Sequence, residues 1–353
     1  MAQARIIATD ENIREIVKSE INRLGDQADL NHVDVSNVTD MTFMFEESKF
    51  NGDISKWDVS KVENMAGMFT GSEFNGDISG WDVSKVENMA GMFTGSEFNG
   101  DISGWDVSNV RNMKGLFYYS QFNGDISNWD VSNVESMLQM FKTSKFDGNI
   151  SQWDVSGVKY MNHMFEDSKF NGDISQWDVS NVKDMSCMFY ESKFNGDISQ
   201  WDVSKVENMS YMFNESSFNG NLSEWNVSKV ENMDGMFQLS KFNGDVSQWN
   251  VRDDCSVNGA LHFNKSGDFG KLHFMLKANN EFIVLHPDAK AAYDTSMPVA
   301  KAMYPNESPS VQAARAWDAY QASQSQGATD SYDYTAALDA CDFSSTAESE
   351  YTR

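Results

Sequence analysis

Aspartate residues recur every 24 residues along much of the chain, and a row of carboxylates could ligate a cation. One such row comprises Asp34, Asp58, Asp82, Asp106, Asp130, Asp154, Asp178 and Asp202. If neighbouring repeats pair as strands, these carboxylates lie about 4.8 Å apart, where like charges repel by roughly 1 kcal/mol in water. Bound calcium would relieve this repulsion, because calcium prefers carboxylate oxygens. The alternative is Asx-type hydrogen bonding to nearby backbone N–H groups.

Asparagine replaces aspartate within these rows, and this exchange favours the hydrogen-bonding interpretation. Asn226 and Asn250 lie in the row of Asp58, and Asn149 lies in a second row that contains Asp53. Asparagine keeps an accepting side-chain oxygen but carries no charge. We therefore predict hydrogen bonds and no cofactor, with calcium binding kept as the alternative.

Three histidines near the C-terminal end could form a metal site. His262, His273 and His286 lie on three predicted strands. These strands span residues 260–263, 271–276 and 281–286. Three histidines that leave one position open resemble a catalytic zinc site, but the alternating pattern equally places them on the solvated face of a sheet. We predict no metal here and keep the three-histidine site as an alternative.

Five positions of the repeat differ between copies, whereas the apolar positions scarcely change. These are the positions of Asn64, Ala66, Gly67, Thr70 and Gly71. The candidate partner-binding residues found at these positions in other copies are Tyr118, Tyr119, Leu138, Tyr160, His163, Tyr190 and Tyr211. Phe43 also occupies one of these positions. The simplest interpretation is ordinary packing between neighbouring surface aromatics. Because exposed tyrosines are common at the centres of protein interfaces, a partner-binding strip is the functional hypothesis beside it.

A 24-residue repeat must position all of these residues. Residues 57–80 recur without change as residues 81–104. The same spacing separates Trp57, Trp81, Trp105, Trp129, Trp153, Trp177, Trp201, Trp225 and Trp249. A fixed period of this length is typical of stacked repeat proteins, in which each unit buries its apolar face against the next.

Each repeat divides into three predicted elements. Residues 54–59 are rich in β-branched and aromatic side chains and predict a short strand. From Val62 the apolar spacing becomes helical, and Ser60 with Glu63 forms a capping-box pattern. Residues 74–77 predict a turn. The predicted fold class is an α/β solenoid, a leucine-rich-repeat-like array of strand–helix or 3₁₀–turn coils.

The repeats also set the domain boundaries. Residues 1–29 predict a capping helix that begins at Thr9-Asp10 and ends at Gly25. Its apolar face comprises Ile13, Ile16, Val17, Ile21 and Leu24. About nine repeats occupy residues 30–252, and the first carries Val33 at the tryptophan position. Residues 253–323 predict a small α+β domain. The polar tail, 324–353, is expected to be flexible or docked on a partner, and this C-terminal segment is a candidate for oligomerisation or assembly.

Composition narrows the function. The formal net charge of −26 argues against nucleic acid as a partner. The N-terminus lacks the apolar region of a signal peptide, and no apolar run reaches the roughly 18 residues of a membrane span. Cys187, Cys255 and Cys341 predict neither a disulfide framework nor a zinc motif. Common nucleotide-binding and hydrolase motifs are missing from the sequence, so we predict that the protein is not an enzyme.

The recurring blocks carry a family resemblance. Residues 57–62 (Trp-Asp-Val-Ser-Lys-Val), the Met-Phe pair at 68–69 and residues 74–79 (Phe-Asn-Gly-Asp-Ile-Ser) recur in phase from about residue 30 to 251. This pattern resembles the BspA-type leucine-rich-repeat surface proteins and the related repeat of mycoplasma surface lipoproteins. The resemblance implies protein binding or adhesion, and a location on a cell surface or a virion.

Three functional hypotheses follow from the sequence. The first is a non-catalytic scaffold for protein binding or surface adhesion. The second is a structural or receptor-binding protein of a phage or other virus, favoured by the missing signal peptide and the separate C-terminal segment, since virion proteins are often assembled in the cytoplasm. If the protein is on neither a cell surface nor a virion, the expected location is the cytoplasm. The third is a metal-dependent enzyme with its site in the C-terminal segment.

Overall fold

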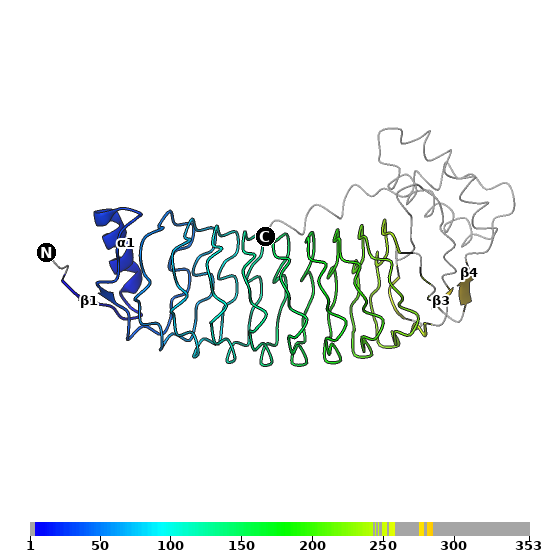
Figure 1. The fold of residues 1–353 in the computed structure, drawn as a ribbon. Helices are drawn as coiled ribbons and strands as arrows, with labels where there is room; N and C mark the ends of the chain where they lie inside the picture. The colour runs from blue at the N-terminus through cyan, green and yellow to red at the C-terminus, as the bar shows by residue number, and fades with distance from the viewer. Residues whose placement is uncertain are drawn as a thin grey trace, which may run out of the picture.

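The structure is a stack of 24-residue coils. The computed structural model describes residues 4–242, 244, 246, 249–252, 254–257, 275–278 and 281–284. Successive coils lie side by side, and helix α1 lies at the N-terminal end of the stack (Figure 1). Counted from one tryptophan position to the next, the first coil is residues 33–56 and the eighth is residues 201–224. The leucine-rich-repeat-like class remains a prediction.

Helix α1 spans Ile13–Leu24 and covers the first coil. It begins later than the sequence predicts because the Asn12 side chain accepts a hydrogen bond from the Thr9 N–H at 2.8 Å and holds the preceding residues in a turn. It ends at Gly25, as predicted, where φ is +90°. The apolar face that packs against the core comprises Ile13, Ile16, Val17, Ile21 and Leu24. No helix in the described part of the chain combines the length and apolar character needed to cross a membrane.

Two short strands join the N-terminus to the first coil. Strand β1 (Ile6–Ile7) pairs in parallel with strand β2 (Val33–Asp34). The Ala8 N–H donates to the Asp34 carbonyl at 2.9 Å and extends this contact. The sequence does not single out residues 6–7 as a strand, because two residues are too few to show a periodic pattern.

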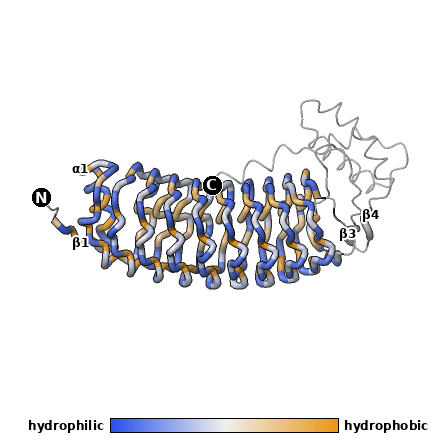
Figure 2. The backbone as a smooth tube through the Cα atoms, in the orientation of Figure 1, coloured by the Kyte–Doolittle hydropathy of each residue, from blue (hydrophilic) through white to orange (hydrophobic). Residues whose placement is uncertain are grey.

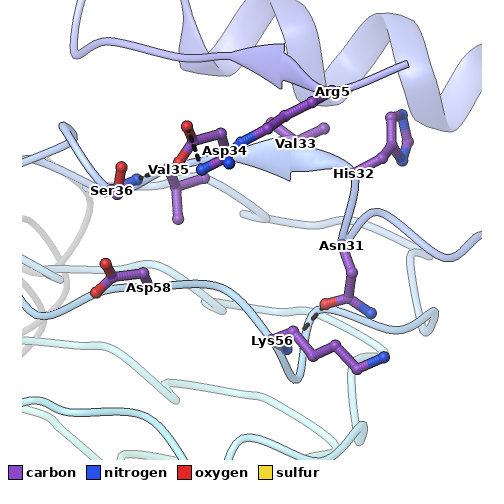
Figure 3. A pocket seen from close by; sticks show the side chains of 9 residues that line it. All are labelled: Arg5, Asn31, His32, Val33, Asp34, Val35, Ser36, Lys56 and Asp58. Carbon is purple, nitrogen blue, oxygen red and sulfur yellow. Dashed lines mark hydrogen bonds and ion pairs between the residues drawn. The ribbon is translucent and has the colours of Figure 1, made fainter. Parts of the chain in front are cut away.

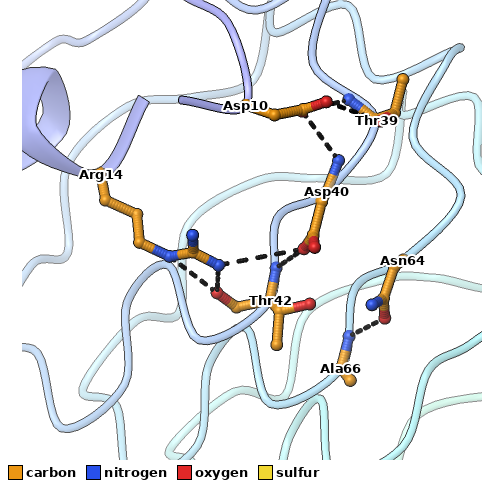
Figure 4. Close-up of polar contacts among 7 residues, drawn as sticks. All are labelled: Asp10, Arg14, Thr39, Asp40, Thr42, Asn64 and Ala66. Atoms are coloured by element: carbon orange, nitrogen blue, oxygen red, sulfur yellow. Dashed lines mark hydrogen bonds and ion pairs between the residues drawn. The ribbon is translucent and has the colours of Figure 1, made fainter. Parts of the chain in front are cut away.

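The carboxylate of Asp10 takes the place of a missing coil (Figure 4). In the second coil, the N–H groups of Glu63 and Asn64 donate to the Thr39 carbonyl at 2.9 and 3.2 Å. In the first coil, the corresponding N–H groups of Thr39 and Asp40 donate to Asp10 Oδ1 at 2.7 and 3.1 Å. Asp10 therefore satisfies donors that an open end of the stack would leave unpaired.

Backbone hydrogen bonds join each coil to the next. The N–H groups that donate to the following coil, at 2.7–2.9 Å, include those of Met65, Gly67, Phe69 and Gly71. The N–H groups that donate three residues back within the same coil, at 3.1–3.2 Å, are those of Met68, Thr70 and Ser72. Turns and contacts between coils thus alternate along this segment, and single parallel bridges such as Asn64–Asn88 link neighbouring coils.

This arrangement differs from the predicted strand–helix–turn plan. The helical spacing from Val62 onward belongs to overlapping turns, because residues with positive φ, such as Gly67 and Gly71, interrupt a right-handed helix. Residues 54–59 turn rather than extend, since the Trp57 N–H donates to the Ile54 carbonyl at 3.1 Å. Among the described coils, only the first has a strand at this position, namely β2.

Ladders of aromatic side chains fill the core. Phe69 and Phe93, on successive coils, stack with ring centroids 5.7 Å apart, and the same contact recurs along the stack. In the stack, the indole N–H of each tryptophan from Trp57 to Trp249 donates to a backbone carbonyl 27 residues earlier in the chain, as Trp81 does to Ile54 at 3.2 Å. The indole therefore buries its apolar surface without losing a hydrogen bond. The colours of Figure 2 show apolar residues recurring at corresponding places along the stack.

Pairing continues past the predicted end of the array at residue 252. Ser256 bridges Asn232, and its N–H donates to the Glu231 carbonyl at 2.8 Å. Farther on, β3 (Met275–Ala278) and β4 (Glu281–Val284) form an antiparallel pair. These strands overlap two of the predicted ones, and the predicted strand at 260–263 and the tail at 324–353 lie outside the described residues.

Removing one whole coil should leave the stack folded. Deletion of residues 57–80 keeps every native neighbour, because residues 81–104 have the same sequence. We expect a cooperative urea transition, followed by tryptophan fluorescence, whose m-value falls by roughly a tenth. Deletion of residues 57–78 is the matched control, since it breaks the 24-residue register and should abolish the transition. An unfolded 57–80 deletion variant would contradict the coil-by-coil account.

Candidate partner-binding surface

Two positions in each of the nine successive coils have left-handed backbone, with φ between +48° and +65°. The first left-handed row comprises Phe43, Gly67, Gly91, Gly115, Gln139, His163, Cys187, Tyr211 and Gly235. The second left-handed row comprises Glu47, Gly71, Gly95, Tyr119, Thr143, Asp167, Glu191, Glu215 and Leu239. Glycine adopts this conformation without steric cost. The second and third coils have glycine at both positions.

Twelve residues other than glycine occupy these rows. A left-handed conformation costs such a residue roughly 1–2 kcal/mol. Both rows carry side chains in the first coil and in the fifth to eighth coils, and the cost is concentrated there. Since other coils show that glycine fits, the side chains themselves need an explanation, and strained backbone often accompanies a functional surface.

Several large aromatic side chains on and beside these rows reach solvent. The exposed fractions are 52% for Phe43, 63% for Tyr119, 46% for Tyr160 and 41% for Tyr211. The Phe43 ring lies against the backbone of the next coil, because a Cβ on Gly67 would lie 2.2 Å from it. Tyr211 lies against Gly235 in the same way. The Phe43 and Tyr211 rings thus each pack against a glycine of the following coil.

A third row lies between the two left-handed rows and contains interacting polar side chains. The Lys142 Nζ atom lies 5.9 Å from the centre of the Tyr118 ring. It also lies 2.9 Å from Glu166 Oε1, and His163 Nδ1 lies 2.5 Å from Glu166 Oε2. The fourth, fifth and sixth coils thus contribute to one network, in which the Glu166 carboxylate accepts from two side chains.

The protonation states of Glu166, Cys187 and Tyr190 do not favour chemical reactivity. Burial raises the pKa of Glu166, but hydrogen bonds from His163 and Lys142 outweigh it and lower this pKa below its ordinary value. Burial raises the pKa of the Cys187 thiol to about 12 and also raises the pKa of Tyr190 above its usual range. Cys187 and Tyr190 are therefore protonated at neutral pH, and Cys187 is a poor nucleophile.

The structure brings the predicted residues onto one side of neighbouring coils. His163 and Tyr211 lie in the first left-handed row and Tyr119 in the second. Tyr118 and Tyr190 belong to the row between them and are half-buried. Leu138 is half-buried and Tyr160 is exposed, one and three residues before the first left-handed row.

Sequence reasoning missed Lys142 and Glu166 as members of this surface. Lys142 and Glu166 lie 24 and 48 residues after Tyr118, so their shared position was visible. Aromatic side chains at this position indicate an interface, whereas a lysine and a glutamate there are equally typical of an ordinary exposed surface. Phe43 is one of the aromatics at the variable positions and lies three coils before the candidate binding residues.

The aspartate rows form hydrogen bonds, as predicted. Asp58 Oδ1 accepts from the Ser60 N–H at 3.2 Å and from the Ser60 hydroxyl at 2.6 Å. Hydrogen bonds from Ser84 likewise lower the pKa of Asp82. Asn226 accepts from the Ser228 N–H in the same way, which explains why asparagine replaces aspartate. These bonds account for the rows without a cation.

Of the predicted metal alternatives, the described residues include the aspartate rows but not the three histidines. Within the part of the chain that the structure describes, no three His, Cys, Asp or Glu side chains cluster as a metal site. His262, His273 and His286 lie outside the described residues, so the three-histidine alternative stays a prediction.

Comparison with known proteins finds one family. A family model described as "Mycoplasma protein of unknown function, DUF285" matches residues 17–121, 95–193, 118–214 and 167–270. These overlapping matches cover well over half of the chain and include every coil of the stack. No curated protein and no solved structure matches the chain.

Replacing Glu166 tests the polar network. Glu166→Gln removes a mostly buried carboxylate that accepts charged hydrogen bonds, so we expect the free energy of unfolding at pH 7 to fall by about 1–3 kcal/mol. Because folding lowers this pKa, the stabilisation is present above the ordinary Glu value of about 4.3 and is lost as pH falls through the lowered pKa. The difference in free energy of unfolding between wild type and variant, measured by urea titration, should therefore shrink as pH is lowered through this range.

Glu207→Gln is the control for this measurement. Glu207 forms a more exposed pair with Lys183 at 3.7 Å, which should contribute at most about 1 kcal/mol. The proposed network of Lys142, His163 and Glu166 would be contradicted if both variants lost the same free energy of unfolding. It would also be contradicted if the loss in Glu166→Gln did not depend on pH.

Proposed function

The chain belongs to the DUF285 family of tandem-repeat proteins, and from that premise we propose that it is a non-catalytic scaffold for protein binding or surface adhesion. The proposed binding surface consists of the two left-handed rows and the row between them, over the fourth to eighth coils. The observation that carries the proposal is the set of exposed aromatic side chains on strained backbone.

The energetics support a role outside folding. Each non-glycine residue in a left-handed row costs the fold about 1–2 kcal/mol, and a whole domain is stable by only about 5–15 kcal/mol. Tyr119 contributes no buried core surface in return, since its side chain is 63% exposed. A partner that covers this ring would bury its apolar surface and gain binding free energy from that burial.

The dimensions of the surface also suit a protein partner. Five coils at about 4.8 Å each place its two ends roughly 20 Å apart. Binding energy in protein interfaces is concentrated in a few central residues, among which tyrosine and tryptophan are frequent. Tyr119, Tyr160 and Tyr211 are exposed within this length.

The chemistry of the surface favours recognition over catalysis. Glu166 is engaged by Lys142 and His163. The buried thiol of Cys187 stays protonated at neutral pH because its pKa is about 12. The resemblance to BspA-type surface proteins leads to the same proposal, because those proteins are associated with adhesion.

Glycine substitutions separate binding from stability. In Tyr119→Gly/Tyr211→Gly, both positions receive the residue that the same rows carry in other coils. Added glycine costs about 0.4–1 kcal/mol of chain entropy each and relieves roughly 1–2 kcal/mol of strain each, so the free energy of unfolding should change little. Loss of two interface tyrosines should weaken partner binding at least about tenfold.

The measurement is a pull-down with the full chain, quantified by mass spectrometry alongside urea unfolding. Gln152→Gly is the matched control, because Gln152 is exposed elsewhere on the fifth coil and its repeat position holds glycine in two other coils. Partners retained by wild type and control but lost by the double variant would support the proposal. Equal retention by all three proteins would remove it.

A further inference from the structure

A polar cavity of about 400 Å³ opens beside the first two coils, away from the proposed binding surface. Its wall comprises Arg5, Asn31, His32, Val33, Asp34, Val35, Ser36, Lys56 and Asp58 (Figure 3). β2 forms one side, and Lys56 and Asp58, at the junction of the first and second coils, form the other. A cavity of this size falls within the range of small-molecule sites.

The charges around the cavity balance. Arg5 and Lys56 supply two cations, and Asp34 and Asp58 supply two carboxylates. Arg5 already pairs with Asp34 at 2.7 Å. An anion would meet the two carboxylates and a cation the two basic groups. A neutral ligand with both donors and acceptors fits this wall best, because it can bond each kind of group.

His32 Nδ1 is among the buried polar atoms at the wall that lack a hydrogen-bond partner within the described residues. The His32 side chain is 8% exposed, and its Nε2 lies 2.8 Å from Glu20 Oε2. Its Nδ1 is buried and forms no hydrogen bond with any described residue. An unpaired buried polar group costs about 1–3 kcal/mol, so a bound molecule or water that reaches it would be stabilising.

The wall departs from the repeat where it is most polar. Asn31, His32 and Val33 stand where Ser55, Lys56 and Trp57 stand 24 residues later. Capping of the stack explains part of this change, since Asn31 Oδ1 accepts from the Lys56 N–H at 2.8 Å and His32 contacts Glu20 of α1. Capping explains neither why His32 Nδ1 is buried without a hydrogen-bond partner nor why a cavity lies beside it.

We propose that this cavity binds a neutral sugar unit. The hydroxyl groups of a sugar both donate and accept, which matches the accepting carboxylates of Asp34 and Asp58 and the donating guanidinium of Arg5 and ammonium of Lys56. Val33 and Val35 offer apolar surface to the C–H face of the ring. This site is separate from the proposed partner-binding surface, and either could exist without the other.

Titration calorimetry of the full chain tests this site. The probes are glucose, galactose, mannose and N-acetylglucosamine, with glucuronate and glucosamine as charged counterparts. We expect at least one neutral sugar to bind, about tenfold more tightly than its charged counterparts. Lys56→Gly and Asp58→Asn should each weaken that binding about tenfold, the effect of losing one good hydrogen bond.

The matched controls are Gln152→Gly and Asp106→Asn. They lie at the same repeat positions in other coils, away from the cavity, and introduce the same residues, glycine and asparagine, so they should bind like wild type. All four variants carry residues that these positions hold elsewhere in the stack, so we expect them to fold. The proposal is overturned if no neutral sugar binds at its solubility limit, if glucuronate or glucosamine binds more tightly, or if Lys56→Gly and Asp58→Asn bind like the controls.

Discussion

Hydrogen bonds between coils are the interaction on which the rest of this structure depends. A coil that turns every few residues cannot satisfy its own backbone, and unpaired buried N–H groups are costly. The N–H groups of Gly67 and Gly71 find acceptors only in the next coil. Each coil therefore needs its neighbour, and Asp10 supplies the acceptor where the first coil has none. The aromatic ladders add apolar burial along the same axis.

The same constraint decides where function can lie. Core positions are occupied by aromatic and aliphatic side chains, and the aspartate rows are used in turns. The left-handed positions are different, because their backbone serves the contacts between coils while their side chains are free to vary. A tyrosine at such a position costs strain but leaves the inter-coil hydrogen bond in place, as for Tyr119, whose N–H donates to the Lys142 carbonyl at 2.9 Å. Binding residues can thus change from coil to coil without changing the stack.

The repeat, its core positions and the end of the capping helix could be predicted, since each depends on residue type and period alone. The conformation inside a coil could not, because overlapping turns place apolar residues at nearly the spacing of a helix. Glycine at positions 67 and 71 is compatible with left-handed backbone. Gln139 and Thr143 have the same backbone conformation, although neither residue type indicates it. Tyr119 and Tyr211 were recognisable candidates, whereas the link from Tyr118 through Lys142 to Glu166 depends on contacts between coils that only the structure shows.

Amide hydrogen exchange of the intact protein tests the central claim most directly. The account predicts slow exchange at Met65, Gly67, Phe69 and Gly71 and at the equivalent positions of the interior coils, because those amides donate to the next coil. Protection should fall toward the ends of the stack, where fewer neighbours stabilise each coil. Exchange at these interior amides as fast as in an unfolded peptide would contradict it.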